Sequence, residues 1–423
     1  MTSLYSVKHV NRLILAYKTP ILYSGSSMLK GLASMMTGII IAKYIFPNDL
    51  GLWAVISLAS TYSLFLQGGL INGLNLELPY AYGRSEDGYA KKMAGVVQTF
   101  LVSIAILILM AGFVCFLALP YNDPKIKHGI LAISLIIALS FYQNYLLSTF
   151  RSKHSFLKLS VIQIVDICTS IFSLLLVVYF AYSGMIVRSI VIPFVSVLQL
   201  HIFRPIKVGF LWDKMIFLKL LKTGIPIFAL AYLEATALTS DKVWLTKFST
   251  ISNVGLYTFS LYALNLFMTF ATSVANYIYP RMTFEYGKTG SKMQLWKQVK
   301  KITFVLASLQ LPFVIIGFFI IPIAINRFFP NYSLSAAVMQ LLIIAGYFKG
   351  CVVGVNAVWS MKSWKHMILY QTSYAGMLVM FSFVGVYFFD NKIIGAASGI
   401  LLANSLNLFW GMYITYLATH SYK

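Results

Sequence analysis

Residues 94–119, AGVVQTFLVSIAILILMAGFVCFLAL, contain no charged side chain. A helix rises about 1.5 Å per residue, so roughly 20 mostly apolar residues cross the ~30 Å hydrocarbon core of a bilayer. The stretch is continuously apolar and lacks the alternation of outer-membrane strands. It therefore predicts a transmembrane helix.

The whole chain has the same character. Of its 423 residues, 59% are hydrophobic and 10% are charged, whereas soluble domains are ~45–50% apolar and ~25% charged. This composition excludes a soluble enzyme, a disordered chain and a nucleic-acid-binding domain. The net charge of +22 is explained instead by the excess of Lys and Arg in the cytoplasmic loops of membrane proteins.

Eleven further stretches resemble the first, and together they predict twelve membrane spans. The spans are 21–45, 50–76, 94–119, 129–150, 159–180, 184–202, 223–245, 254–280, 302–326, 334–359, 367–389 and 393–418. With the N-terminus inside, 23 of the 33 Lys and Arg residues fall on cytoplasmic segments and 8 on outer ones. Both termini are therefore expected to be cytoplasmic.

The longest inner linker, residues 203–222, lies near the midpoint of the chain and separates six spans from six. A shift of 204 residues superposes IAKYIFPNDLGLW (41–53) on LTKFSTISNVGLY (245–257). Six spans per half make the halves parallel, related by a pseudo-twofold axis along the membrane normal. The predicted fold is an all-α polytopic membrane protein with two six-helix bundles, residues 1–205 and 206–423.

Catalytic chemistry finds little support. The six histidines lie singly, no metal-ligand spacing occurs, and Gly287-Lys288-Thr289 lacks the upstream glycine and strand of a phosphate-binding loop. The outer loops are too short for a catalytic domain. We expect no cofactor, no metal and no enzymatic activity.

Charged residues inside spans are the informative ones, because a charge within the bilayer is costly unless it faces a cavity or a partner. Lys30 and Glu234 lie near the midplane of spans 1 and 7 and are related by the 204-residue shift. They either line a hydrated cavity, Lys30 for substrate and Glu234 for coupling or gating, or form a structural ion pair. Asp241 follows Glu234 on the same helical face, and either joins the coupling group or caps the helix locally.

Two more charges lie within spans. Lys349 in span 10 either lines the cavity or extends to the interface. Asp166 in span 5 is at a comparable depth and is its expected counter-ion, and it is also a candidate for coupling or gating together with Glu234 and Asp241. Polar residues at helical spacing complete the candidate substrate cavity, although they could equally join helices to one another. They are Ser34, Thr37, Asn72, Asn265, Thr269, Thr272 and Asn276.

These features predict a secondary transporter with a polar cavity of mixed charge. SDKVWLTKFSTISNVGLY (240–257), the span ending at Pro280 and GAASGILLANSL (395–406) are similar to the multidrug/oligosaccharidyl-lipid/polysaccharide (MOP) flippase superfamily. The resemblance is to its polysaccharide branch, the O-antigen and capsule-repeat (Wzx-type) flippases, and it extends over the whole chain as a six-plus-six plan.

The resemblance implies flipping of an undecaprenyl-diphosphate-linked oligosaccharide across the bacterial inner membrane by alternating access. It also implies H⁺ or Na⁺ as a coupling ion, contacts with membrane lipids, and a polysaccharide polymerase and chain-length regulator as partners. Nucleic acid is not an expected partner. Two alternatives stay open: a cation-coupled multidrug antiporter of the same architecture, and a membrane polysaccharide polymerase or ligase.

Overall fold

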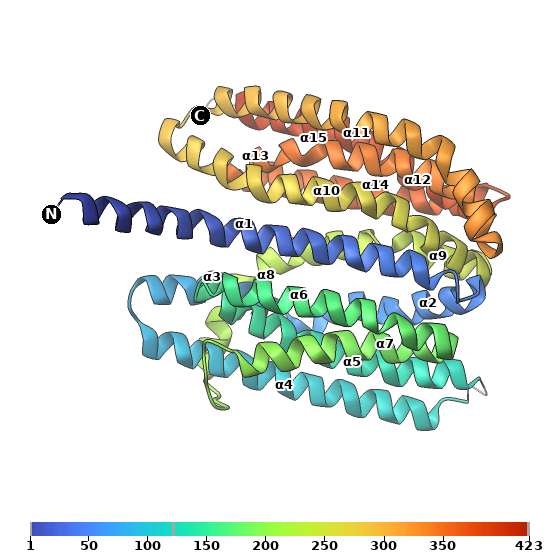
Figure 1. The fold of residues 1–423 in the computed structure, drawn as a ribbon, viewed down its shortest axis with the longest axis horizontal. Helices are drawn as coiled ribbons and strands as arrows, with labels where there is room; N and C mark the ends of the chain where they lie inside the picture. Colours follow the sequence, from blue (N-terminus) through green and yellow to red (C-terminus); the bar gives the residue numbers. More distant parts are fainter. Residues whose placement is uncertain (1, 121–122, 421–423) are drawn as a thin grey trace. The chain divides into compact units, whose positions relative to one another are not determined.

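The protein is represented by a computed structural model that describes residues 2–120 and 123–420. The side chains of residues 2–21, 273, 276, 277 and 280 are outside that description. The described chain consists of helices joined by short connections (Figure 1). The predicted all-α fold class is therefore confirmed.

The described elements are as follows. The first half contains α1 Thr2–Ile41, α2 Pro47–Ser63, α3 Leu70–Gly83, α4 Asp87–Ala118, α5 Pro124–Ser152, α6 Phe156–Phe172 and α7 Leu174–Ile202. The second half contains α8 Lys214–Ala237, α9 Ser240–Phe248, α10 Ile251–Thr289, α11 Lys292–Phe328, α12 Ser335–Cys351, α13 Asn356–Ser360, α14 Trp364–Phe388 and α15 Lys392–His420. Short 3₁₀ turns are η1 Leu64–Gln67, η2 Pro330–Tyr332 and η3 Val352–Val355.

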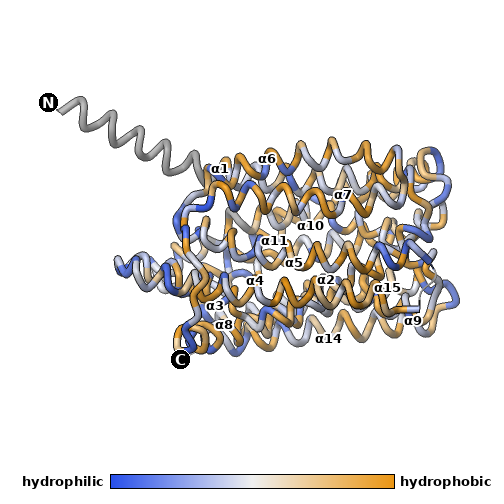
Figure 2. The backbone as a smooth tube through the Cα atoms, turned by 90° about the horizontal axis from the view of Figure 1, so that it is seen from below, coloured by the Kyte–Doolittle hydropathy of each residue, from blue (hydrophilic) through white to orange (hydrophobic). Residues whose placement is uncertain are grey.

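Ten helical stretches among the described residues are long and apolar enough to cross a membrane. Nine of them overlap one predicted span each, and Leu174–Ile202 overlaps both 184–202 and the end of 159–180. The rest of span 159–180 falls largely on α6, and span 21–45 falls on α1. Hydrophobic residues run along the helices, whereas hydrophilic residues gather near many helix ends (Figure 2). The chain is a multi-pass membrane protein.

The fifth and sixth predicted spans meet at a reversal inside α7. Ala181 has φ 46° and ψ −122°, which no helix contains. A methyl group on Gly184 would lie 1.8 Å from the carbonyl oxygen of Leu176, although eight residues of continuous helix would separate the two by about 12 Å. The chain therefore turns back at Ala181, so that α6 and residues 174–180 form one span and residues 182–202 form the next.

The helices group into two compact units by their internal contacts. Unit 1 contains Met1–Thr37 and Ser63–Ala229, and unit 2 contains Gly38–Tyr62 and Leu230–Lys423. Relative to a division at residue 205, unit 2 thus takes α2 from the first half, and unit 1 takes the start of α8 from the second. The two units are described separately below.

In unit 2, α2 crosses α10 at two glycines related by the 204-residue shift. A methyl group on Gly51 would lie 1.9 Å from the carbonyl oxygen of Ile251, and one on Gly255 would lie 1.8 Å from that of Pro47. Pro47 and Ile251 are themselves related by the same shift. The reciprocal contact is the geometry that a twofold axis produces where it passes between two equivalent helices.

In unit 1, span 2 is interrupted where the sequence has two consecutive glycines. Gly68 and Gly69 both adopt positive φ, 57° and 83°, which glycine adopts without the steric cost of a Cβ. Beyond the break, α3 packs closely on α8, because a methyl group on Gly73 would lie 2.1 Å from the carbonyl oxygen of Leu220. This close approach attaches the start of α8 to unit 1.

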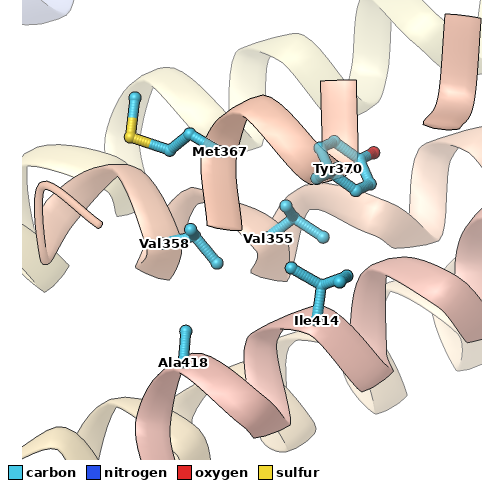
Figure 3. Packing of buried hydrophobic residues seen from close by; sticks show 6 residues of the cluster. All are labelled: Val355, Val358, Met367, Tyr370, Ile414 and Ala418. Carbon is cyan, nitrogen blue, oxygen red and sulfur yellow. The ribbon is translucent and has the colours of Figure 1, made fainter. Parts of the chain in front are cut away.

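The core of unit 2 includes an apolar cluster at the end of the unit where α13 leads into α14. Val355 and Val358 from η3 and α13 meet Met367 and Tyr370 from α14, and Ile414 with Ala418 from α15 closes the cluster (Figure 3). All six side chains are buried. The cluster fixes the first turns of α14, and the following turns of that helix contain residues of the candidate site.

Candidate functional site

In unit 1, Lys30 of α1 forms an ion pair with Asp166 of α6. The lysine Nζ lies 2.5 Å from the carboxylate Oδ2, which also accepts a hydrogen bond from the Ser196 hydroxyl of α7 at 3.1 Å. The Lys30 side chain is 39% exposed, whereas that of Asp166 is 2% exposed. A buried carboxylate thus holds a lysine that other groups can reach.

Further polar contacts join α1 to α6 on either side of this pair. Toward the start of α1, the Ser26 hydroxyl donates to the Gln163 amide oxygen at 2.6 Å. Toward its end, the hydroxyls of Thr37 and Ser170 lie 3.4 Å apart. The residue numbers rise together along both helices, so α1 and α6 run parallel, as expected for two odd-numbered spans.

Arg188 of α7 extends this polar stack. Its guanidinium donates to the hydroxyls of Thr37 at 2.9 Å and Ser170 at 2.8 Å. Arg188 lies only four residues beyond the start of the predicted span 184–202, where a charge is ordinary at the membrane interface, so it was not among the predicted site residues. Its position one turn inside that span was the signal of an interior role.

In unit 2, Glu234 of α8 is the centre of a second charged cluster. Its Oε1 lies 3.8 Å from the Nζ of Lys349 on α12, and its Oε2 accepts a hydrogen bond from the Gln371 amide of α14 at 2.6 Å. Here the exposures are reversed, because the lysine side chain is 14% exposed and the glutamate 38%. The carboxylate is therefore the accessible member of this pair.

An aromatic residue completes the lysine's surroundings. The Lys349 ammonium lies 3.9 Å from the ring centroid of Tyr374, a favourable cation–π distance. The Tyr374 hydroxyl donates to the Asn404 side chain at 2.8 Å, which fixes the ring. Lys349 therefore points into unit 2 and does not extend to the interface.

The expected pairing of the charges was wrong. Lys349 was assigned Asp166 as its counter-ion, and a pair of Lys30 with Glu234 was the structural alternative. Instead each lysine has a carboxylate partner in its own unit, because helix spacing gives the depth of a charge but not its neighbouring helix. Lys30 and Glu234 correspond under the 204-residue shift, and Gln371, the hydrogen-bond partner of Glu234, lies next to the position that corresponds to Asp166. The contacts of Lys30 with Asp166 and of Glu234 with Gln371 therefore join equivalent pairs of helices.

The remaining predicted residues lie outside these two clusters. Asp241 of α9 is buried and accepts hydrogen bonds from the Tyr257 hydroxyl at 2.6 Å and the Lys242 backbone at 2.7 Å. It joins no group with Glu234, and it is not the N-cap of α9, which is Thr239. Asn72 is half-buried on α3, and Ser34 is exposed on α1.

The polar stripe of α10 is largely at the surface of unit 2. Asn265 and Thr272 are exposed, and the Thr269 hydroxyl donates to the Asn265 carbonyl at 2.9 Å. The side chain of Asn276 lies outside the described residues. Over the described residues, no group of three His, Cys, Asp or Glu side chains gathers as a metal site.

The arrangement suits ion and anion binding in apolar surroundings. A family model described as "Polysaccharide biosynthesis protein" matches residues 96–337, more than half of the chain. The chain belongs to the polysaccharide biosynthesis protein family. The solved structures that share its fold are named as transporters or as a flippase. No curated protein sequence matches the chain.

Several solved structures have the same fold as this chain. An inward-facing multidrug resistance MATE transporter of the MOP superfamily is 15% identical, with a TM-score of 0.66 over 93% of this chain and 100% of that one. The lipid II flippase MurJ is 14% identical, with a TM-score of 0.68 over 95% and 88%. The Vibrio cholerae MATE transporter VcmN is 15% identical, with a TM-score of 0.59 over 95% and 96%. The predicted resemblance to the MOP superfamily is thereby confirmed at the level of the fold.

Proposed function

We propose that the protein flips an undecaprenyl-diphosphate-linked oligosaccharide across the bacterial inner membrane by alternating access, in the synthesis of O-antigen or another surface polysaccharide. Both termini lie in the cytoplasm in this proposal. The family match and the transporter fold support it. The observation that carries it is the ion pair of Lys30 with Asp166 inside apolar helices.

Charges persist within membrane spans mainly where they serve a substrate or ion pathway. Lys30 is the exposed member of its pair, so its ammonium can turn from Asp166 toward the diphosphate of the cargo. Asp166 keeps the Ser196 hydroxyl as a hydrogen-bond donor while the lysine is engaged elsewhere. Lys30 is thus an accessible cation that can bind an anionic headgroup.

Glu234 has the complementary role in unit 2. It is the accessible carboxylate of its pair, and it takes the coupling H⁺ or Na⁺ while Lys349 and Gln371 hold it in position. Ser34 and the exposed α10 residues Asn265 and Thr272 supply hydroxyl and amide groups for the sugars, whereas the buried Thr37 positions Arg188. A polymerase and a chain-length regulator are the proposed protein partners.

The proposal is tested in cells that lack the protein. Such cells accumulate the lipid-linked repeat on the inner leaflet and lose surface polysaccharide, while synthesis of the repeat continues. The wild-type gene restores export, whereas the double variant Lys30→Met/Asp166→Asn at normal abundance does not. Arrest of synthesis at an earlier sugar-addition step would contradict the proposal.

A second candidate is a cation-coupled multidrug antiporter of the same architecture. The accessible carboxylate of Glu234 favours it, because such transporters bind cationic compounds. In that case the deletion would sensitise cells to cationic drugs and leave surface polysaccharide unchanged. The two candidates therefore give opposite results in the same deletion strain.

A further inference from the structure

The linker between α7 and α8, residues 203–213, packs on α4 of unit 1. The Leu211 backbone N–H donates to the Thr99 hydroxyl at 2.9 Å, and a methyl group on Gly95 would lie 3.2 Å from the Leu211 Cβ. Beyond Thr99, α4 continues for 19 residues to Ala118, a length of about 28 Å. The hydrocarbon core of a bilayer is about 30 Å thick, so the linker lies at one of its boundaries.

The end of α7 lies at the same depth. From the reversal at Ala181 to His201 this helix runs for 20 residues, a length of about 30 Å. His201 and the linker that follows it are therefore level with the lipid headgroups on one side of the membrane. In the proposed orientation this is the cytoplasmic side.

Aromatic side chains of the linker are exposed at this depth. Phe203, Phe210 and Trp212 are each more than half exposed. The Trp212 ring packs against Phe217 with ring centroids 5.0 Å apart, and Phe217 packs against Phe100 of α4 at 5.2 Å. Aromatic residues are enriched where membrane proteins meet the headgroups. The linker thus presents a fixed apolar surface to the membrane interface.

At the start of the linker, three side chains meet with more hydrogen-bond donors than acceptors. Nη1 of Arg204 lies 2.7 Å from Nε2 of His201, and the Tyr142 hydroxyl of α5 lies 2.7 Å from Nδ1 of the same ring. Arginine only donates, and a neutral imidazole has one acceptor and one donor nitrogen. When Nε2 accepts from Arg204, Nδ1–H donates to the Tyr142 oxygen. The Tyr142 proton and the other guanidinium protons then have no acceptor among the described residues.

The linker also carries positive charge that the described part of the chain does not balance. No carboxylate among the described residues forms an ion pair with Arg204 or Lys207. Asp213 is the only acidic residue of the linker, and it accepts hydrogen bonds from the backbone N–H groups of Met215 and Ile216 at 2.9 Å and 3.1 Å. Its carboxylate is thus engaged at the start of α8. An anion from outside the chain is therefore the partner that fits Arg204.

We propose that Arg204, His201 and Tyr142 bind the phosphate of an anionic phospholipid, with the aromatic residues of the linker seated among the neighbouring lipids. A guanidinium and surplus donors match phosphate oxygens, and basic residues next to a membrane favour anionic lipids. Bilayer phosphates lie at this depth at all times, whereas the diphosphate of the cargo is assigned to Lys30 within α1. The inference does not depend on the transported substrate.

The test uses the purified full-length protein in phosphatidylcholine nanodiscs that contain a phosphatidylglycerol with a photoreactive headgroup. We expect cross-links to peptides that contain Tyr142 or residues 201–207. Unlabelled phosphatidylglycerol should prevent these cross-links, whereas additional phosphatidylcholine should not. Arg204→Gln should need about fivefold more of the photoreactive lipid for the same cross-linking, which is the contribution typical of one basic residue near an anionic surface.

Arg151→Gln is the matched control, because it removes the same charge from the same unit. Arg151 is exposed on α5, nine residues beyond Tyr142 and about 13 Å farther along the helix axis, so cross-linking should be unchanged in this variant. Tyr142→Phe keeps the ring and removes the donor, and it should weaken cross-linking without lowering the melting temperature.

Equal loss of cross-linking in Arg204→Gln and Arg151→Gln would show a general effect of charge and overturn the inference. Cross-links of the wild type confined to other peptides would overturn it too, and this measurement needs no variant. Displacement of the photoreactive lipid by undecaprenyl diphosphate but not by phosphatidylglycerol would assign the site to the cargo and equally contradict the proposal.

Discussion

Asp166 holds the ammonium of Lys30 at 2.5 Å, and the carboxylate is almost fully buried while the lysine is 39% exposed. The two members of the pair therefore differ in what happens when the other is removed. A lysine left alone can be hydrated, whereas a carboxylate left alone at this depth cannot. Because the two side chains differ in burial, substituting one or the other should destabilise the protein to different extents.

Lys30→Met should reduce the amount of folded protein more than Asp166→Asn does. The first leaves a buried anion, and breaking a buried pair in this way typically costs about 3–5 kcal/mol. The double variant should recover abundance but not export, because the cation for the diphosphate is gone. Fluorescence-detected size exclusion measures abundance, and surface polysaccharide measures export. Recovery of export by the double variant would show that the pair is structural only.

The order should be reversed in unit 2. There the lysine is the buried member, so Glu234→Gln leaves Lys349 without its carboxylate and should lower the melting temperature more than Lys349→Met. Gln371→Leu is the matched control, because it removes a hydrogen bond to Glu234 but no charge. Melting of the detergent-purified variants decides the order, and equal destabilisation by the two charge variants would refute this account of unit 2.

Gly51→Val and Gly255→Val should each reduce the yield of folded protein. Either side chain would overlap a backbone carbonyl of the other helix, and overpacking of this kind typically costs 1–3 kcal/mol or more. Gly88→Val serves as the control, since a methyl group there meets nothing within 4 Å. Thermal unfolding followed by size exclusion is the measurement. Normal stability of either crossing variant would mean that α2 and α10 do not meet at these residues.

The reversal at Ala181 predicts which sides of the membrane its flanking residues face. In a background without Cys115, Cys168 and Cys351, cysteines placed at Tyr179 and Ser183 should label from the side opposite to one placed at Lys153. If residues 174–202 crossed the membrane as one continuous helix, Ser183 would lie about 13 Å along that helix, inside the bilayer, and would not label from either side. An impermeant maleimide on intact cells distinguishes the two arrangements, with labelling after lysis as the control for access.

The spans were predictable from sequence because burial in lipid demands about 20 apolar residues, and this demand is local. The 204-residue shift aligns Gly51 with Gly255, but their contact was found only in the structure. The break in span 2 has a sequence signal, the two adjacent glycines Gly68 and Gly69.

The charge pairs could not be predicted in the same way. Depth along a helix comes from counting residues, but the partner depends on which helices are neighbours, and single-sequence spacing does not contain that information. Arg188 was missed because a charge near a span end has an ordinary explanation at the interface. Asp241 was assigned to the same face as Glu234 because α8 and α9 were taken as one helix, whereas a break at residues 238–239 separates them.

The assignment of α2 to unit 2 also has a consequence for how the protein is made. Gly51 leaves the ribosome early, but its partner Gly255 follows 204 residues later. At about 5–20 residues per second, synthesis needs roughly 10–40 s to reach it. During that interval α2 is in the membrane without α10, so its glycine face has no partner helix. The segment that is synthesised first therefore packs into its unit late. Unit 2 starts with a segment that the ribosome delivers long before the rest of the unit exists.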